Sequence, residues 1–311
     1  MTAQPAANFD PRRPFGVVEA AAAGIPERRL RTRSYQRIFN GVYVAAAVPI
    51  TPELRAVAAL VPFEAQAYLS HASAARVYGA PIPAIADEFV TVRHPSDRRR
   101  RPGIVCRAET GGQIYRKGNV RLSGPDQLFA ELATLLQLID LVAVGDWLVR
   151  KEYTTPERLV AFCARRRGAG AELARRAAAY VRERVDSPME TLLRMLIVLA
   201  GLPEPVVNLT LRSEIGEPVR RHDLCYPGQR IAIEYNGRVH LSADNAEADS
   251  DRREDSDNDG WRTLVVFSRG IYVEPQRTVE RIWRVARERK VPGTPVRPRD
   301  DWRPHFPGRG S

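Results

Sequence analysis

Two acidic residues, Asp223 and Glu234, flank a Pro-Gly turn signal in a stretch where apolar and polar residues alternate. With residues 228 and 229 as the loop, the register of a hairpin pairs Asp223 with Glu234 and Leu224 with Ile233. Residues paired in this way have Cβ atoms about 4.5–5.5 Å apart, and like charges at that distance repel. Two facing carboxylates therefore predict a bound cation, and the alternative is a solvated acidic face that water and salt screen.

The elements around this hairpin follow from capping signals and apolar periodicity. Ser187 is the expected N-cap of a helix, with Pro188 in its first turn and Glu190 completing a capping box. The same hairpin register pairs Arg221 with Asn236. Further elements are expected in the order α-β-β-β-α-β-α: the helix from 187 to 201, a strand over 206–211, the two hairpin strands, a helix within 244–259, a strand over 261–267 and a helix over 275–290.

The N-terminal segment, residues 1–45, predicts a winged helix-turn-helix. A short helix from Phe15 ends at Gly24, a basic helix follows Pro26, and a β-hairpin surrounds Asn40-Gly41. In that motif the second helix enters the major groove of DNA. We expect four arginines to face phosphates or bases: Arg28, Arg29, Arg31 and Arg33. The alternative is a small helical cap whose arginines are only solvated.

The middle region, residues 46–185, is expected to be an α/β interaction domain. Strands are predicted over 88–92 and 104–106, and helices over 52–60, 65–79, 126–136, 138–150 and 172–184. His71 lies in a small-residue helix and is interpreted as a structural histidine. The arginine run 98–101 is interpreted as a solvated loop. The sequence contains no glycine-rich loop of the kind that cradles phosphates.

Composition narrows the class of protein. The chain has 311 residues, 44% of them hydrophobic, and no run of eighteen apolar residues, which predicts two or three domains and no membrane span. Cys106, Cys163 and Cys225 are scattered and the N-terminus lacks a signal peptide, so we expect a cytoplasmic protein. The net charge of +11 favours a polyanionic partner, with DNA first. Arginine supplies almost all of that charge, which is also typical of a GC-rich genome.

The C-terminal third resembles the Vsr-like (very-short-patch-repair-like) family of the PD-(D/E)XK nuclease fold, a family common in actinobacteria. The resemblance covers about residues 186–290 and depends on a set of short motifs: Ser187-Pro-Met-Glu190, Gly201-Leu-Pro203-x-Pro205, His222-Asp223-Leu224, Ile233-Glu234-x-Asn236-Gly237-x-x-His240, Asp251-Arg252-Arg253 and Gly260-Trp261. It implies a Mg²⁺- or Mn²⁺-dependent phosphodiesterase site.

The N-terminal half resembles the AbiEi-type antitoxin and regulator proteins. The matching residues are Ala20-Ala21-Ala22-Ala23-Gly24-Ile25 with Arg29-Leu30, then Gly41-Val42-Tyr43, and later Ser70-His71-Ala72-Ser73-Ala74-Ala75. This resemblance implies a winged helix followed by a domain that contacts a toxin or another protein.

The nuclease resemblance assigns a role to each matching residue. Asp223 and Glu234 would hold the metal ion, Glu190 would be the helix acid of the site, and His240 would move protons near the scissile phosphate. Arg252 would contact DNA, and Asn236 and Asp251 would support the site. Two carboxylates are enough for Mg²⁺, which keeps several waters and takes further oxygens from phosphate.

The sequence departs from the nuclease pattern at one position. The motif ends in Glu-x-Lys, and this chain has Glu234-Tyr235-Asn236. Asparagine can hydrogen-bond a water molecule but supplies no positive charge, although Vsr-like members also lack that lysine. Three functions stay open: a metal-dependent endonuclease, a non-catalytic DNA-binding regulator or antitoxin of a type IV toxin–antitoxin-like system, and a toxin-binding protein without DNA contact.

The expected architecture is thus an α/β multidomain protein. We expect a winged helix-turn-helix over residues 1–45, an α/β interaction domain over 46–185, a PD-(D/E)XK αβββαβ core over 186–290 and a disordered tail over 291–311.

Overall fold

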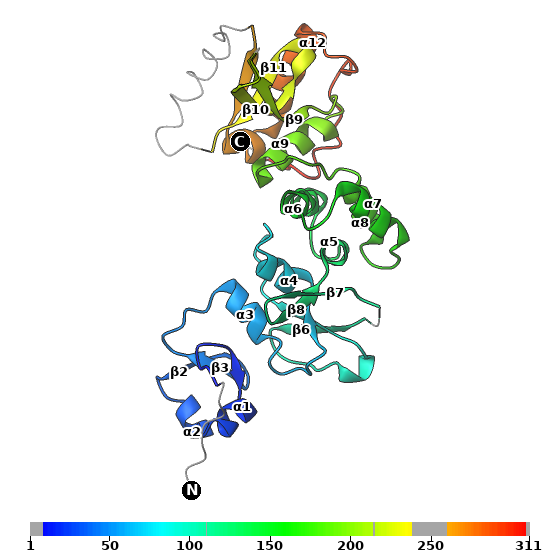
Figure 1. Cartoon of the computed structure of the whole chain (residues 1–311). Helices are drawn as coiled ribbons and strands as arrows, with labels where there is room; N and C mark the ends of the chain where they lie inside the picture. The colour runs from blue at the N-terminus through cyan, green and yellow to red at the C-terminus, as the bar shows by residue number, and fades with distance from the viewer. Residues whose placement is uncertain (1–8, 110, 214, 238–259, 309–311) are drawn as a thin grey trace. The chain divides into compact units, whose positions relative to one another are not determined.

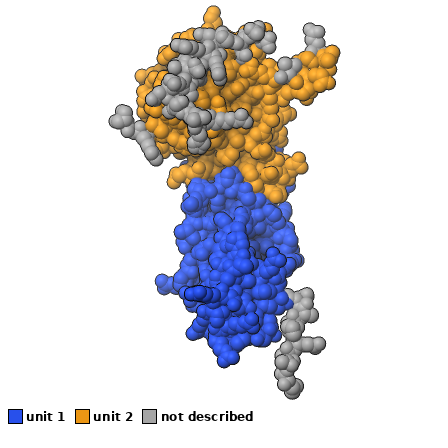
Figure 2. Space-filling view, turned by 90° about the vertical axis from the view of Figure 1, so that its left-hand side faces the viewer, with its two compact units in different colours: residues 1–136, 157–175 blue, residues 137–156, 176–311 orange. Residues whose placement is uncertain are grey.

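The computed structural model describes residues 9–109, 111–213, 215–237 and 260–308 (Figure 1). This part of the chain is a mixed α/β protein whose strands form three sheets. The chain divides into two compact units, drawn in separate colours in Figure 2: unit 1 is Met1–Leu136 with Glu157–Arg175, and unit 2 is Gln137–Pro156 with Arg176–Ser311. This division differs from the three folded domains that the sequence suggested, because the expected middle domain contributes to both units.

Unit 1 begins with a three-stranded antiparallel sheet in the order β1-β3-β2 and two short helices. The elements are β1 (Phe15–Gly16), α1 (Val17–Ala22), α2 (Glu27–Leu30), β2 (Tyr35–Phe39) and β3 (Val42–Ala45). The hairpin predicted around Asn-Gly is confirmed, with Gly41 at a φ of 76° in its turn. The second helix is a single turn with Pro26 as its N-cap in an extended conformation. A small core of Phe15, Ala20, Leu30 and Tyr43 holds these elements together.

The rest of unit 1 contains a five-stranded sheet in the order β6-β5-β4-β8-β7. Its strands are β4 (Tyr68–Leu69), β5 (Glu88–Val92), β6 (Ile104–Ala108), β7 (Ile114–Lys117) and β8 (Val120–Ser123). Its helices are α3 (Pro52–Ala58), α4 (His71–Tyr78), α5 (Pro125–Leu132) and α7 (Pro156–Arg165), with α8 (Ala171–Ala178) beginning at its C-terminal end.

One expected helix in unit 1 is wrong. Residues 65–79 form not one helix but the short strand β4 followed by α4. Leu69 pairs with Val90 on one side and with Leu122 on the other, so sheet pairing overrides the helical propensity of this alanine-rich stretch. Helix α4 then begins at His71, whose φ is 48°.

The histidine at this junction lies in a buried polar network. The His71 backbone N–H donates to Glu131 Oε2 at 2.9 Å, and the imidazole stacks on Phe89 at 5.2 Å between ring centroids. Ser123 Oγ donates to both carboxylate oxygens of Glu131 at 2.8 and 3.0 Å. Burial raises the pKa of Glu131 to about 7 and lowers the pKa of His71 to about 3. These contacts fit the interpretation of His71 as a structural residue.

Unit 2 contains a four-stranded sheet in the order β12-β11-β10-β9, with helices packed on it. The strands are β9 (Val206–Arg212), β10 (Pro218–Tyr226), β11 (Ile231–Tyr235) and β12 (Arg262–Val266). The helices are α6 (Leu138–Arg150), α9 (Pro188–Leu199), α11 (Ser268–Tyr272) and α12 (Pro275–Glu288). Strands β9, β10 and β11 are antiparallel neighbours, whereas β11 and β12 are parallel. Helix α9 contacts β10, β11, α11 and α12.

A buried ionic cluster fixes α9 against α6. Arg194 is fully buried and donates to Asp146 Oδ2 at 2.9 Å and to Glu204 Oε1 at 3.0 Å. Asp146 also accepts from Thr191 Oγ1 at 2.8 Å and from the Arg182 backbone N–H at 2.7 Å. A charge buried this deeply is tolerated only when its partners satisfy it, so the cluster defines how α9 lies in the unit.

The C-terminal segment differs from the disordered tail expected over 291–311. Residues 291–308 are described, and the side chains of Val291, Trp302 and Phe306 are buried. The Arg299 backbone N–H donates to Ala200 O at 2.8 Å, at the end of α9. The segment is rich in proline and arginine, but its few apolar residues attach it to unit 2.

None of the helices in the described ranges has the length and apolar character needed to cross a membrane.

Candidate functional site

The hairpin of unit 2 has the register that the sequence predicted. Leu224 pairs with Ile233 and Tyr226 with Ile231. The ladder ends at Leu224–Ile233, and Asp223 and Glu234 are the residues that come next on the two strands, close enough for the charge of Glu234 to raise the pKa of Asp223. The loop is longer than expected: Pro227–Gln229 form a 3-10 turn, and Arg230 completes it at a φ of 51°. The strand register is the same for both loop lengths, because Pro227 and Arg230, the two residues added to the loop, would have paired with each other in the shorter loop.

Asp223 is held by the backbone of the facing strand. Its Oδ2 accepts from the Tyr235 backbone N–H at 3.0 Å. Burial raises the pKa of the Asp223 carboxyl, and the charge of Glu234 raises it further, while the Tyr235 N–H and Arg221 act in the opposite direction. A half-buried carboxylate next to another carboxylate favours a proton or a cation.

Glu234 is held by a buried histidine. Nδ1 of His222 lies 3.1 Å from Glu234 Oε1, which makes Nδ1 the protonated nitrogen when the carboxyl is ionised. The His222 ring is fully buried and lies 4.5 Å from the ring of Trp261. Its Nε2 is buried without a hydrogen-bond partner in the described part of the chain. His222 thereby fixes one oxygen of Glu234 and leaves Oε2 for another ligand.

Glu190 lies at the N-terminus of α9 and is saturated by hydrogen bonds. The predicted capping box is present: Ser187 Oγ accepts from the Glu190 N–H at 3.2 Å and donates to its Oε1 at 2.9 Å. Glu190 Oε2 accepts from the Asp186 N–H at 2.9 Å. Burial raises the pKa of Glu190, and the charge of Asp223 contributes in the same direction. Glu190 is therefore an electrostatic neighbour of Asp223 whose oxygens are already engaged.

Asn208 is a site residue that the sequence analysis missed. Its Nδ2 donates to Glu190 Oε2 and to Arg184 O, both at 2.6 Å, and its backbone has a φ of 48°. Asparagine is one of the few residues that tolerate this left-handed conformation, and here it occurs inside strand β9. The sequence signal, an asparagine in an otherwise β-forming run, was too weak to identify it.

An arginine–aspartate contact borders the carboxylates. The Arg221 guanidinium donates to Asp186 Oδ2, and the Arg221 side chain is half exposed. Asp186 has a second cationic partner in Arg150, whose Nε lies 3.5 Å from Asp186 Oδ1. The edge of the site thus contains two guanidinium groups that share one aspartate.

The donor set fits a cation with two protein ligands. In the described residues, Asp223 Oδ1 and Glu234 Oε2 make no hydrogen bond, so one oxygen of each carboxylate is free to coordinate. Mg²⁺ and Mn²⁺ prefer oxygen ligands, and Mg²⁺ keeps several waters when it binds. No group of three or more His, Cys, Asp or Glu side chains in the described ranges could hold a metal ion, so Glu190 adds no third ligand there.

Several expected site residues are placed differently or fall outside the described ranges. Asn236 is exposed beyond the end of β11, and its backbone N–H donates to Val266 O at 2.9 Å. His240, Asp251 and Arg252 lie outside the described residues, as does the helix expected within 244–259.

The four arginines expected to contact DNA are all exposed in unit 1. Arg28 and Arg29 belong to the single turn of α2, Arg31 follows it, and Arg33 lies in the turn before β2. Arg31 forms an exposed ion pair with Glu27 at 2.6 Å. Such a pair is weak in water and leaves the guanidinium available to phosphate.

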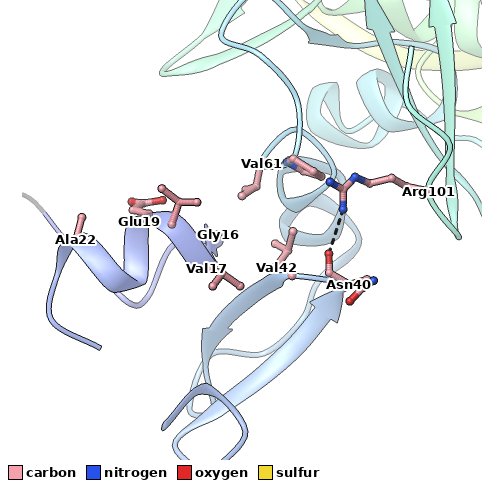
Figure 3. Close-up of a pocket in the computed structure, with 11 residues that line it drawn as sticks. Gly16, Val17, Glu19, Ala22, Asn40, Val42, Val61 and Arg101 are labelled. Atoms are coloured by element: carbon pink, nitrogen blue, oxygen red, sulfur yellow. Dashed lines mark hydrogen bonds between the residues drawn. The ribbon is translucent and has the colours of Figure 1, made fainter. Parts of the chain in front are cut away.

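A hollow of about 560 Å³ lies near these helices, between α1, the turn of the β2–β3 hairpin and Val61 (Figure 3). Only Glu19 and Arg101 are charged among its 11 lining residues, and Arg101 Nη1 donates to Asn40 O at 3.4 Å. The hollow is mostly aliphatic and has no pair of facing acids, so the carboxylates of unit 2 remain the candidate for chemistry.

Comparisons with known proteins give relatives without a described activity. No family model matches the chain. Two proteins of Mycobacterium tuberculosis, the uncharacterized proteins MT2308 (strain CDC 1551 / Oshkosh) and Rv2248 (strain ATCC 25618 / H37Rv), are each 26% identical over 255 residues, which is 80% of this chain and 91% of theirs. The crystal structure of the RV2827C protein from M. tuberculosis aligns with 66% of this chain and 85% of that one, at 15% identity and a TM-score of 0.38.

Proposed function

We propose that unit 2 is a metal-dependent phosphodiesterase of the PD-(D/E)XK type that acts on DNA. The observation that carries the proposal is the neighbouring carboxylates of Asp223 and Glu234, each with one oxygen held by the protein and one oxygen free of hydrogen bonds within the described residues. The order of α9, β9, β10, β11, β12 and α12 supports it, because this is the element order of that nuclease core apart from the part outside the described residues.

The chain's own residues would orient the metal ligands. The Tyr235 N–H sets the rotation of the Asp223 carboxylate, and His222 sets that of Glu234. A bound Mg²⁺ or Mn²⁺ would supply charge stabilisation on the phosphate and a water of lowered pKa. In the hydrolysis a water oxygen forms a bond to phosphorus, one P–O bond of the backbone breaks, and the released oxygen takes a proton. His240 remains a proposal for that proton transfer.

We propose further that the N-terminal elements of unit 1 act as a winged helix-turn-helix on duplex DNA. The exposure of Arg28, Arg29, Arg31 and Arg33 around α2 supports this role. Phosphate contacts impose a steep salt dependence, so charge reversal at Arg29 and Arg31 should weaken DNA binding and flatten its salt dependence. DNA binding that stayed unchanged after both reversals would remove the winged-helix proposal.

The second candidate is a regulator or antitoxin that binds DNA without cutting it. The saturated hydrogen bonding of Glu190 favours it, because a site with two free carboxylate oxygens has fewer ligands than a complete nuclease site. In this case Asp223→Ala should leave DNA binding and regulation unchanged. A contact between the protein and a toxin would remain compatible with either candidate.

The decisive experiment combines metal binding and cleavage on the same samples. Calorimetry with Mg²⁺ and Mn²⁺ should give binding to the wild type and none to Asp223→Asn or Glu234→Gln, and a DNA-nicking assay should give activity in the wild type alone. If the wild type neither bound metal nor nicked DNA, the nuclease proposal would fail and the regulator would stand. If Asp223→Asn still nicked DNA with metal, the site assignment would be wrong.

A further inference from the structure

The proposed site has no cation at the position of the nuclease lysine, and the nearby Arg220 is paired with one of the metal-binding acids, its Nη2 lying 3.8 Å from Glu234 Oε1. Three acids surround the site, Glu190, Asp223 and Glu234, and the position where the nuclease motif has a lysine is Asn236. A phosphodiester carries a negative charge that grows on the oxygens during attack, and a fixed positive group near that charge is a large source of rate enhancement. A neutral asparagine amide cannot provide it.

A second arginine, Arg221, lies on the neighbouring strand. It precedes Asp223 by two residues on β10, so both side chains lie on the same face of the sheet. Arg221 pairs with Thr210 of β9, three residues along β10 from the last β10–β11 pair, Leu224–Ile233. Its charge acts on Asp223, whose pKa it lowers against the effect of burial, and its side chain is half exposed and accessible to a substrate.

Arg221 is paired with Asp186, and Asp186 can release the Arg221 guanidinium because it has a second cationic partner. Asp186 accepts from Arg221 through Oδ2 and is also paired with Arg150 through Oδ1. If Arg221 left for a phosphate, Arg150 would still balance the aspartate. The backbone N–H of Asp186 donates to Glu190 Oε2, which fixes this aspartate at the border of the acidic cluster.

We propose that Arg221 binds the scissile phosphate and supplies the positive charge that Asn236 cannot, and that Asp186 holds its guanidinium until the phosphate displaces it. Arg221 would then be a catalytic residue and Asp186 a positioning residue. This inference depends on the proposed nuclease function. Arginine suits the role because its planar fork binds two phosphate oxygens at once and stays charged.

The test uses the full-length chain and two independent measurements. The first is Mn²⁺ binding by calorimetry without DNA, and the second is single-turnover nicking of a supercoiled plasmid with Mn²⁺. Arg221→Ala should nick on the order of 100-fold more slowly, as for the loss of one charge-stabilising donor, and Arg221→Lys should recover a part of the rate. The matched control is Arg212→Ala, which removes an exposed arginine of β9 that donates to Gly216 O and touches none of the site residues, and it should nick at the wild-type rate.

The metal measurement separates a catalytic from a structural role. Removing a cation near Asp223 should leave Mn²⁺ affinity unchanged or make it tighter, because less positive charge then repels the metal. Slow nicking with retained Mn²⁺ binding supports the inference. Nicking by Arg221→Ala at the wild-type rate, or loss of Mn²⁺ binding together with nicking, overturns it while leaving the nuclease itself established. A wild type that neither binds Mn²⁺ nor nicks DNA overturns both proposals.

Discussion

Neutralising one of the two facing acids should stabilise the protein without metal and abolish its response to metal. In Asp223→Asn, the amide oxygen can still accept from the Tyr235 N–H, so the substitution removes charge and little else. With the two charged groups about 5 Å apart, the repulsion with Glu234 is about 1 kcal/mol in water and about 3 kcal/mol at an effective dielectric of 20. Because Glu234 is partly exposed and Arg221 lies close by, we expect a gain near the lower value, about 1 kcal/mol.

Magnesium should also stabilise the wild type, and it should leave Asp223→Asn unchanged. A ligand that binds only the folded state at 100 times its Kd stabilises that state by about 2.7 kcal/mol. Urea unfolding in EDTA and in saturating Mg²⁺ measures both effects. The matched control is Asp140→Asn, since Asp140 is a half-buried aspartate of α6 whose pKa burial also raises, and this variant should keep the full response to Mg²⁺. The reasoning is refuted if Asp223→Asn is less stable than the wild type in EDTA, or if Mg²⁺ stabilises both proteins equally.

Three further predictions concern buried polar residues that stabilise the folds of the two units. Arg194→Ala should destabilise unit 2 by about 3–5 kcal/mol in urea unfolding, since it leaves the buried Asp146 charge unpaired. The folded state keeps a proton on Glu131 up to its raised pKa of about 7, and the unfolded chain loses that proton near 4.5, so the contribution of Glu131 to the stability of unit 1 should fall as the pH rises from 4.5 through 7. His71, whose pKa is lowered from 6.5 to about 3, has the opposite sign in the same range, so the measurement is the difference in urea-unfolding stability between the wild type and Glu131→Gln, which should shrink as the pH rises. Asn208→Ala should cost about 1–3 kcal/mol by melting experiments, through two lost hydrogen bonds and a strained backbone, and Asn208→Gly should cost less.

The parts of unit 2 that the sequence predicted are those with strong local signals. The Ser187–Glu190 capping box and the alternating hairpin each have their own local pattern, and the bounds of α9 and the register of β10 with β11 follow from them. The residues that support the acids were less accessible to prediction. His222 and Asn208 reach Glu234 and Glu190 only after the chain has folded, and no spacing in the sequence indicates such contacts.

Unit 1 illustrates the opposite case, in which tertiary pairing reverses local preference. Residues 65–79 are rich in alanine and favour a helix, yet Tyr68–Leu69 form the strand at the centre of the five-stranded sheet. A two-residue strand has no periodicity to detect. Strands β7 and β8 were also not expected, because the arginines in them mask the alternation of apolar residues.

Several destabilising features of unit 2 occur together around Glu190. The carboxylates of Asp223 and Glu234 lie close enough to repel, the Glu190 carboxyl is buried with a raised pKa, and two non-glycine residues, Arg184 and Asn208, have left-handed backbones joined by a hydrogen bond. Each of these features costs free energy, and a sheet needs none of them to fold. Strain and unfavourable charge concentrate where a binding geometry is maintained at the expense of stability. Such features favour a ligand site beside Glu190, Asp223 and Glu234, and they would serve either of the two proposed ligands, a metal ion with DNA or DNA alone.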